Sequence, residues 1–562
     1  MTDAPVASFN LVDEPWLPVV PLGGAAAEWS LRETLARAHE VREMVDPSPL
    51  ATVALHRLLL AVVHRGFGPA SRTAWHALWS AGRLDPARLD ATLDAARPRF
   101  DLFDPVHPFY QSTSPSLARA SPISHLAVEC AAKAWPTLLD HGWDNDGRTM
   151  PAAEAARCVV ATHAFALGGF VSADNAAGKS SAAAAPLANT AVVLIRGNSL
   201  FETLMLNLVV YNLSTGHPFE PFTDLPDRPA WERDEPVSAG VRSPDGYLDW
   251  LTFQARAVRL GPPVLVDGAW HVAEAVVMDG YRPPSQIVWQ RAETMVPSVA
   301  RIEKPKPGED DAGESLPYAP LKFRSGRVLF RDSLALLGSA NPETAARPKT
   351  VDAYHTLRGR RPTDAGPELP RLLQLDVLGL LGDQKKLVLR RSERFACSPE
   401  YLADEALQDR LGAALTLAEE AARDLLGRGW TRAPRGESRP RPLQVLADEL
   451  LPGIGGKPDP KAVAGFVASL QADVGYWPRL EAPFRALLAD LPADGPTAMA
   501  AWAAAVRAAA DATFRDAVRA AGTSPRGYRA AAKAEARFAV ALGAMVNAFT
   551  REHGPEPAEE AS

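Results

Sequence analysis

The chain is 562 residues long, with 47% hydrophobic and 23% charged residues. That balance is typical of a folded protein and excludes an intrinsically disordered chain, while the length exceeds what one hydrophobic core supports and predicts at least two packed units. The formal net charge of −7 excludes a chain that is basic overall, so any contact with nucleic acid must be local.

Neither a membrane span nor a secretion signal is visible in the sequence. It has no run of about 18 consecutive apolar residues, and the N-terminal MTDAPVASF lacks the basic flank and apolar stretch of a signal peptide. We therefore expect a cytoplasmic protein without membrane contact. The three cysteines, Cys130, Cys158 and Cys397, lack the paired spacing of a zinc site or a disulfide framework, so no metal or cofactor is expected.

Residues 1–394 mix strand-like and helical stretches, separated by prolines and loop signals, which predicts a large α+β domain. Short apolar runs rich in β-branched residues predict strands at 191–197, 251–260 and 286–291. A helix with one apolar face is predicted at 50–65, where the spacing of apolar residues matches the helical period at Leu55, Leu58, Leu59 and Val62.

Residues 395–553 are rich in alanine, leucine and charged residues at helical spacing, which predicts a C-terminal four-helix bundle. The expected helices lie at 407–425, 460–475, 497–521 and 525–552. Three helix starts carry an N-cap residue followed by a proline: Ser398-Pro399, Asp459-Pro460 and Ser524-Pro525. Residues 554–562 are predicted to form a disordered acidic tail.

Motifs that carry enzymatic chemistry are missing from the sequence: it has no nucleophile elbow, paired metal-ligand histidines, phosphate loop or dinucleotide fingerprint. His56 and His64 fall on one predicted helix and are interpreted as structural histidines. A hydrolase whose site escapes a motif search is one alternative. A DNA-binding protein that acts alone is another, and the negative net charge disfavours it.

Five ordered stretches resemble the CasA family, the large subunits of the type I-E CRISPR Cascade surveillance complex. They are FNLVDEPWLPV from Phe9, SPLATVALHRLLLAVVHRGFG from Ser48, FDLFDPVHPFYQ from Phe100, LANTAVVLIRGNSLFETLMLNL from Leu187 and DLPDRPAWERD from Asp224. The C-terminal helical region also fits the family's four-helix bundle.

This resemblance implies a non-catalytic subunit that recognises the short motif flanking a double-stranded DNA target, promotes strand separation and R-loop formation, and helps recruit a helicase-nuclease. The guide RNA reads the target by base pairing, a division of labour shared with other RNA-guided effectors. The implied partners are the other Cascade subunits, the CRISPR RNA, the target duplex and the helicase-nuclease. Family members approach the motif from the minor groove, where the hydrogen-bond code is degenerate.

The family's glycine loop corresponds to ALGGFVSADNAAGKS, where Gly168 and Gly169 are the residues expected at the groove. Without a Cβ, glycine lets the backbone approach the groove floor. A turn that needs positive φ explains the same glycines equally well. The loop also carries alanines and serines where some relatives have further glycines.

The family's lysine finger corresponds to RIEKPKPGEDD, where Lys304 is the first choice and Lys306 the second. A flexible ammonium group on a loop reaches groove acceptors or a phosphate without fixed geometry. Plain solvation is the alternative for either lysine.

The family's glutamine wedge corresponds to Gly382-Asp383-Gln384, a tight turn between two apolar runs that predicts a β-hairpin. Gln384 is expected to insert beside the first target base pair, and Asp383 stands where relatives often have asparagine. Neighbouring basic residues are expected to hold displaced phosphates: Lys385, Lys386, Arg390 and Arg391.

The family's loop that contacts Cascade near the 5′ end of the guide corresponds to residues 138–150, LLDHGWDNDGRTM. Leu138, Leu139 and Trp143 are its expected docking residues. An exposed tryptophan suits an interface anchor, and a buried one is the alternative.

Overall fold

The computed structural model describes residues 7–127, 147–169, 171, 182–211, 219, 223–284, 292–300, 318–338, 345–358, 368–383, 386–427, 430–432, 438–451, 453–454, 457–520 and 522–555. The chain divides into two compact units. The N-terminal unit comprises Met1–Ser325 and Asn341–Ala396, and the C-terminal unit comprises Gly326–Ala340 and Cys397–Ser562. The second unit therefore includes a short segment, 326–340, that lies well before the expected boundary at residue 395.

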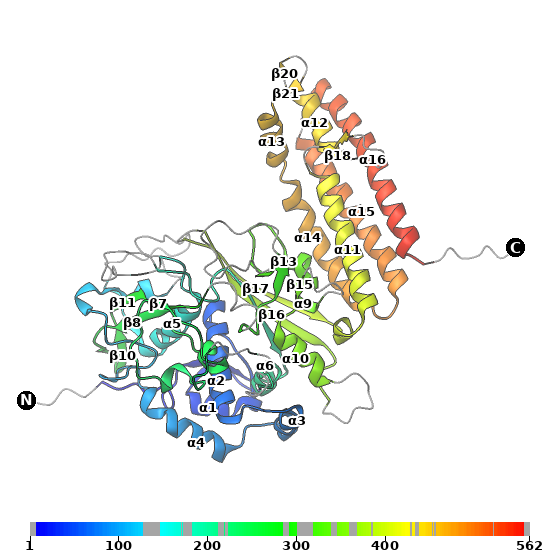
Figure 1. The fold of residues 1–562 in the computed structure, drawn as a ribbon. Coiled ribbons are helices and arrows are strands. Elements are labelled where there is room, and N and C mark those ends of the chain that lie inside the picture. Colours follow the sequence, from blue (N-terminus) through cyan, green and yellow to red (C-terminus); the bar gives the residue numbers. More distant parts are fainter. Residues whose placement is uncertain are drawn as a thin grey trace, which may run out of the picture. The chain divides into compact units, whose positions relative to one another are not determined.

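Helix α2 (Pro49–Phe67) is the central helix of the N-terminal unit (Figure 1). It begins where the Ser48 side chain accepts a hydrogen bond from the amide of Ala51. The predicted helix is confirmed, but the single apolar face is wrong, because α2 is buried almost all round. Its length and hydropathy would suit a membrane span, yet 89% of that stretch is buried inside the protein. Burial accounts for the apolar composition of α2.

The other α-helices described in the N-terminal unit are α1 (Leu31–Ala36), α3 (Arg72–Ala81), α4 (Pro86–Ala96), α5 (Ala152–Phe165), α6 (Leu200–Asn207), α7 (Tyr247–Leu251) and α10 (Lys349–Arg358). Of these, α4, α5, α6 and α7 pack against α2.

Small sheets of two or three strands make up the β structure described in this unit. Five of them have the strand orders β2-β1-β3 (Ala27–Trp29, Leu17–Pro21, Val41–Met44), β5-β10-β9 (Met150–Pro151, Ala269–Val272, Val264–Val266), β4-β11-β8 (Ser121–Pro122, Glu274–Asp279, Arg256–Leu260), β12-β7 (Tyr281–Arg282, Gly240–Val241) and β14-β13-β15 (Tyr318–Pro320, Ser298–Ala300, Ala345–Ala346).

A sixth sheet has the order β17-β16-β6 and contains the longest strands described in the unit, β16 (Leu373–Asp383) and β17 (Lys386–Cys397). The strand predicted at 191–197 is confirmed as β6 (Ala191–Arg196). Figure 1 shows β16 and β17 side by side as one long hairpin. The mixed helix and sheet content confirms the α+β assignment.

The strand predicted at 251–260 is only partly correct, because its first half is not extended. Helix α7 ends at Leu251, and the amide of Thr252 closes it by donating to the carbonyl oxygens of Leu248 and Asp249. The strand β8 begins only at Arg256. The third predicted strand, 286–291, lies outside the described residues.

Four long helices dominate the C-terminal unit: α11 (Glu405–Asp424), α14 (Ala472–Asp490), α15 (Gly495–Ala520) and α16 (Pro525–His553). They lie side by side in Figure 1 and pack through buried aromatic residues, including Phe514 stacked on Phe538 with 4.1 Å between ring centroids. Shorter elements complete the unit: α9 (Ser333–Leu337), α12 (Pro442–Leu450), α13 (Pro460–Ser469), β18 (Trp430–Arg432), β19 (Ser438–Pro440), β20 (Gly453–Ile454) and β21 (Lys457–Pro458).

Two expected details of this unit are wrong. The helix predicted at 460–475 ends at Ser469, because Gln471 adopts positive φ (47°), and α14 then runs through Pro478 and Pro483. Internal prolines oppose a helix, which is why the sequence did not indicate α14. Ser398-Pro399 starts a short 3-10 turn instead of α11, whose N-cap is Asp404. Asp459 and Ser524 cap α13 and α16 as predicted.

Three histidines are buried in the described part of the N-terminal unit, and burial lowers the pKa of His56, His64 and His163 to about 4. Each has an ordinary pKa of about 6.5 in the unfolded chain. The unfolded chain therefore binds protons between pH 6.5 and 4 that the folded chain does not, so stability is full above pH 6.5 and falls as the pH drops through this window. We expect the melting temperature to be several degrees lower at pH 5 than at pH 7.

The variant His163→Gln tests whether the buried histidines cause this acid sensitivity, because it removes one of the three titrating groups. The loss of melting temperature between pH 7 and pH 5 should be smaller in that variant than in the natural chain. Equal losses would show that the buried histidines do not cause the acid sensitivity.

Candidate functional site

Three elements are predicted from the sequence to contact DNA: the glycine loop, the lysine-bearing stretch and the hairpin. The described residues that flank them lie around the strand β6. On one edge β6 pairs antiparallel with β16, from Gln374 opposite Arg196 to Gly379 opposite Ala191. On the other edge the amide of Ala191 donates to the carbonyl oxygen of Leu321 at 2.9 Å. The amide of Val193 donates to the carbonyl oxygen of Met295 at 2.8 Å. One buried strand thus joins the hairpin to the segments on either side of the lysine-bearing stretch.

The lysine-bearing stretch connects two adjacent strands. β13 and β14 pair antiparallel with Ala300 opposite Tyr318, and residues 301–317 link these two positions. The amide of Leu321 donates to the carbonyl oxygen of Pro297 at 2.8 Å and extends the pairing toward β6. Lys304 and Lys306 fall in the linking residues, which lie outside the described part of the chain.

Gly168 and Gly169 begin the predicted glycine loop directly after helix α5. Gly169 has φ of 75°, a conformation that favours glycine, and its amide donates to the carbonyl oxygen of Ala182 at 2.7 Å. A Cβ placed on Gly168 would lie 3.6 Å from the nearest atoms of Ala182 and Ala184, which is an ordinary contact. Positive φ therefore explains Gly169, whereas Gly168 has room for a side chain.

Arg256, at the start of β8, holds the two limbs of this loop together. Its Nη2 donates to the carbonyl oxygens of Leu167 at 3.0 Å and Ala183 at 2.7 Å, and its Nη1 donates to that of Ala255 at 2.8 Å. The side chain is only 1% exposed, and burial lowers its pKa to about 10, so it stays charged at neutral pH. Sequence reasoning missed Arg256, and its one signal was a charged residue inside an apolar run.

Replacing Arg256 with methionine should loosen the base of the loop, because the substitution leaves buried carbonyl oxygens without a donor. Hydrogen bonds to a charged group contribute about 1.5–3 kcal/mol, so we expect a loss of about 2 kcal/mol in the free energy of unfolding. Hydrogen exchange at the amides of 166–169 and 182–185 should accelerate. Arg282→Met, on an exposed arginine, is the matched control. Unchanged exchange at these amides would contradict the assigned role.

The hairpin meets the glycine loop close to its own tip. The amide of Gly382 donates to Oδ1 of Asn189 at 2.6 Å, and a Cβ added to Gly382 would lie 2.5 Å from Cδ2 of Leu167. A side chain at 382 would therefore require the Leu167 side chain to shift. Gln384 and Lys385 lie outside the described residues, as does the side chain of Lys386.

The two arginines expected to hold phosphates have different surroundings. Arg390 is exposed on β17 and lines a cavity of about 410 Å³ together with Arg157, Glu154 and Phe165. Arg391 forms an ion pair with Glu393, with 2.5 Å between Nε and Oε1, and its guanidinium lies 5.6 Å from the ring centre of Phe323. Arg391 is thus already engaged within the unit.

The expected docking residues Leu138, Leu139 and Trp143 lie in 128–146, outside the described residues. The described chain stops at Ala127 and resumes at Gly147, which has φ of 61°. Leu126 and Ala127, just before this stretch, line the same cavity as Arg390.

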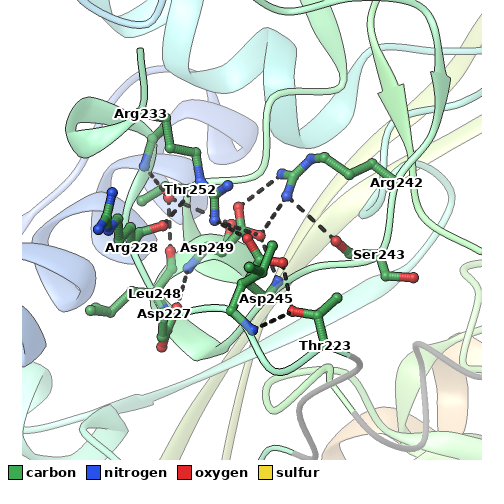
Figure 2. Close-up of polar contacts among 12 residues, drawn as sticks. Thr223, Asp227, Arg228, Arg233, Arg242, Ser243, Asp245, Leu248, Asp249 and Thr252 are labelled. Carbon is green, nitrogen blue, oxygen red and sulfur yellow. Dashed lines mark hydrogen bonds and ion pairs between the residues drawn. The ribbon is translucent and has the colours of Figure 1, made fainter. Parts of the chain in front are cut away.

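A polar network gathers three aspartates and two arginines around the stretch DLPDRPAWERD (Figure 2). Arg242 donates to both carboxylate oxygens of Asp249, at 2.7 and 2.8 Å. Arg233 donates to Asp245 at 2.6 Å. The Asp227 carboxylate accepts the amides of Leu248 and Asp249, each at 3.0 Å, and burial raises its pKa. The carboxylates are bound by arginines and amides, an arrangement that fixes α7 in place. Among the described residues, no group of histidines, cysteines or carboxylates is arranged to hold a metal ion.

The sequence matches the family described as CRISPR-associated protein Cse1 over residues 10–513. It is 31% identical to the CRISPR-associated protein CasA/Cse1 of Thermus thermophilus over 545 residues, which cover 96% of this chain and 98% of the relative. The chain belongs to the Cse1/CasA family.

Solved structures of the Cse1/CasA family have the same fold as this chain. Cse1 from Acidimicrobium ferrooxidans superposes with a TM-score of 0.76 at 25% identity, covering 97% of this chain and all of that one. CasA from Thermus thermophilus superposes with a TM-score of 0.72 at 27% identity, covering 95% and 99%. A chain of a CRISPR RNA-guided surveillance complex shares the fold with a TM-score of 0.68 at 21% identity, covering 95% and 99%. The resemblance to the CasA family is thereby confirmed.

Proposed function

We propose that this chain is the non-catalytic large subunit of a type I-E CRISPR RNA-guided surveillance complex acting in the cytoplasm. In this proposal it recognises the protospacer-adjacent motif in double-stranded DNA and promotes strand separation and R-loop formation. Its partners are the other Cascade subunits with their CRISPR RNA, the target duplex and the helicase-nuclease that it helps to recruit. Residues 1–394 carry motif recognition and docking, and 395–553 form the bundle.

The observation that carries the proposal is the convergence on β6. Three stretches distant in sequence are flanked by residues that hydrogen-bond to β6 or to the residues beside it. These stretches carry Gly168 and Gly169, Lys304 and Lys306, and Gln384. A duplex end held there would meet a backbone loop, a flexible cation and a hairpin tip together. Such a combination suits a degenerate groove and a base pair that must be opened.

The charges support a subunit that depends on its partners. The net charge of −7 opposes unassisted binding to a polyanion, while Lys385, Lys386 and Arg390 place positive charge around the hairpin. The proposed docking segment, with Leu138, Leu139 and Trp143, would attach the chain to the complex that holds the guide.

The experiment that tests this proposal is target binding by the reconstituted guide-RNA complex, with and without this chain. The targets share one complementary sequence and differ only in the flanking trinucleotide. We expect tight binding to require both the chain and a particular flank. If the complex selects the same flanks without the chain, the chain is not the motif reader.

A further inference from the structure

Asn189 has an unusual backbone conformation in the segment that leads from the glycine loop into β6. Its φ is 63°, one of four positive values found at non-glycine residues of the described chain. Asparagine tolerates this region better than most residues, at some cost in conformational energy. Oδ1 of Asn189 accepts the amide of Gly382 at 2.6 Å. A single side chain thus links the end of β16 to the segment between the glycine loop and β6.

The residues around this hydrogen bond are closely packed. A Cβ added to Gly379 would lie 2.1 Å from the carbonyl oxygen of Thr190, so β16 passes directly against the residue that follows Asn189. A Cβ added to Gly382 would lie 2.5 Å from Leu167. The carbonyl of Leu167 is itself held by buried Arg256. The end of β16 therefore packs closely against Thr190 and the base of the glycine loop.

We infer that Asn189 is a positioning residue that couples motif recognition at the glycine loop to the placement of the hairpin tip. Gln384 is only two residues beyond the Gly382 amide that Asn189 holds. That hydrogen bond fixes where β16 ends beside Leu167. Loss of the acceptor would leave the end of β16 less firmly placed, so insertion beside the first base pair should slow. This inference rests on the proposed function, since it assigns roles within the same site.

The chain offers a matched pair of variants at this position. Asn189→Gly keeps positive φ without strain and removes the acceptor, whereas Asn189→Asp keeps an acceptor and tolerates the same φ. Each would be assembled into the guide-RNA complex. One measurement is affinity for a duplex with the correct flank and a non-complementary target, which reports motif binding alone. The other is the rate at which 2-aminopurine at the first target position becomes fluorescent, which reports opening.

We expect Asn189→Gly to open the target about fivefold more slowly, as loss of one hydrogen bond implies, with motif affinity within about twofold of the natural chain. Asn189→Asp should open near the natural rate. A target whose first two pairs are mismatched, and so already open, should restore Asn189→Gly to the natural rate of R-loop formation.

The outcomes separate this inference from the proposed function. If Asn189→Gly opens DNA normally while Gln384→Ala is slow, the coupling is wrong and the proposed function stands. If Asn189→Gly remains slow on the mismatched target, its defect is not in opening, and the coupling is again wrong. If the complex selects flanks without this chain, the proposed function is wrong, and the inference that rests on it is wrong as well.

Discussion

Replacing Gln384 with alanine should slow opening of the first target base pair by tenfold or more, while motif binding changes little. Unstacking one base step costs a few kcal/mol, and in the proposed function the Gln384 amide would offset part of that cost by hydrogen-bonding the freed base edges. A tenfold slower step corresponds to about 1.4 kcal/mol, which is within what two lost hydrogen bonds account for. Stopped-flow 2-aminopurine fluorescence with the assembled complex measures the step.

Two control variants make this result specific. Gln384→Asn keeps the amide on a shorter side chain and should lose less than alanine does. Val388→Ala changes a side chain that is 51% exposed on β17 of the same hairpin and should open DNA normally. If alanine at 384 leaves the opening rate unchanged, or if Val388→Ala slows it equally, the hairpin tip is not the wedge.

Replacing Glu293 with alanine should lower the free energy of unfolding of the N-terminal unit by about 3–5 kcal/mol. The Glu293 carboxylate is fully buried and lies 3.2 Å from Nη1 of Arg57 on α2, whose side chain is 4% exposed. It also accepts Nε1 of Trp250 at 2.9 Å and the amide of Met295 at 2.7 Å. The variant leaves a buried guanidinium without its counter-charge, which is the costly way to break such a pair.

The double variant Arg57→Met with Glu293→Leu tests whether the unpaired charge of Arg57 causes the instability of Glu293→Ala. Removing both charges avoids the uncompensated cation, so part of the lost stability should return. Hydrogen exchange of the α2 amides in urea measures the stability of this unit separately from that of the C-terminal unit. A double variant as unstable as Glu293→Ala would show that lost packing, not an unpaired charge, causes the effect.

Local signals in the sequence predicted much of the secondary structure. The Ser524-Pro525 pair placed the start of α16 because a cap depends on residues within one turn. The periodicity of 50–65 placed α2, but its burial on every side follows from neighbours far along the chain. The helix α14 was not predicted because it contains two prolines, which disfavour a helix locally. It forms because tertiary packing there outweighs local propensity.

Local sequence patterns did not predict the roles of most residues that build the candidate site. The loop, finger and wedge segments came from family resemblance, whereas Arg256 and Asn189 act through partners that are distant in sequence. Asn189 bonds to Gly382, 193 positions away, and Arg57 to Glu293, 236 positions away. Such pairs form only in the folded chain, so the sequence alone does not indicate them.

In the proposed function, the elements around β6 contact the flanking motif and the first target base pair. The most direct test places a photocrosslinking amino acid at position 383, beside the hairpin tip, in the assembled complex and maps the crosslinked nucleotides on target DNA. A second chain, carrying the crosslinker at Leu225, which is 64% exposed, serves as the control. We predict crosslinks from 383 at the motif and the adjoining base pair, dependent on the correct flank, and a different pattern from 225. Crosslinks from 383 spread evenly along the duplex, or absent from the motif, would contradict the account.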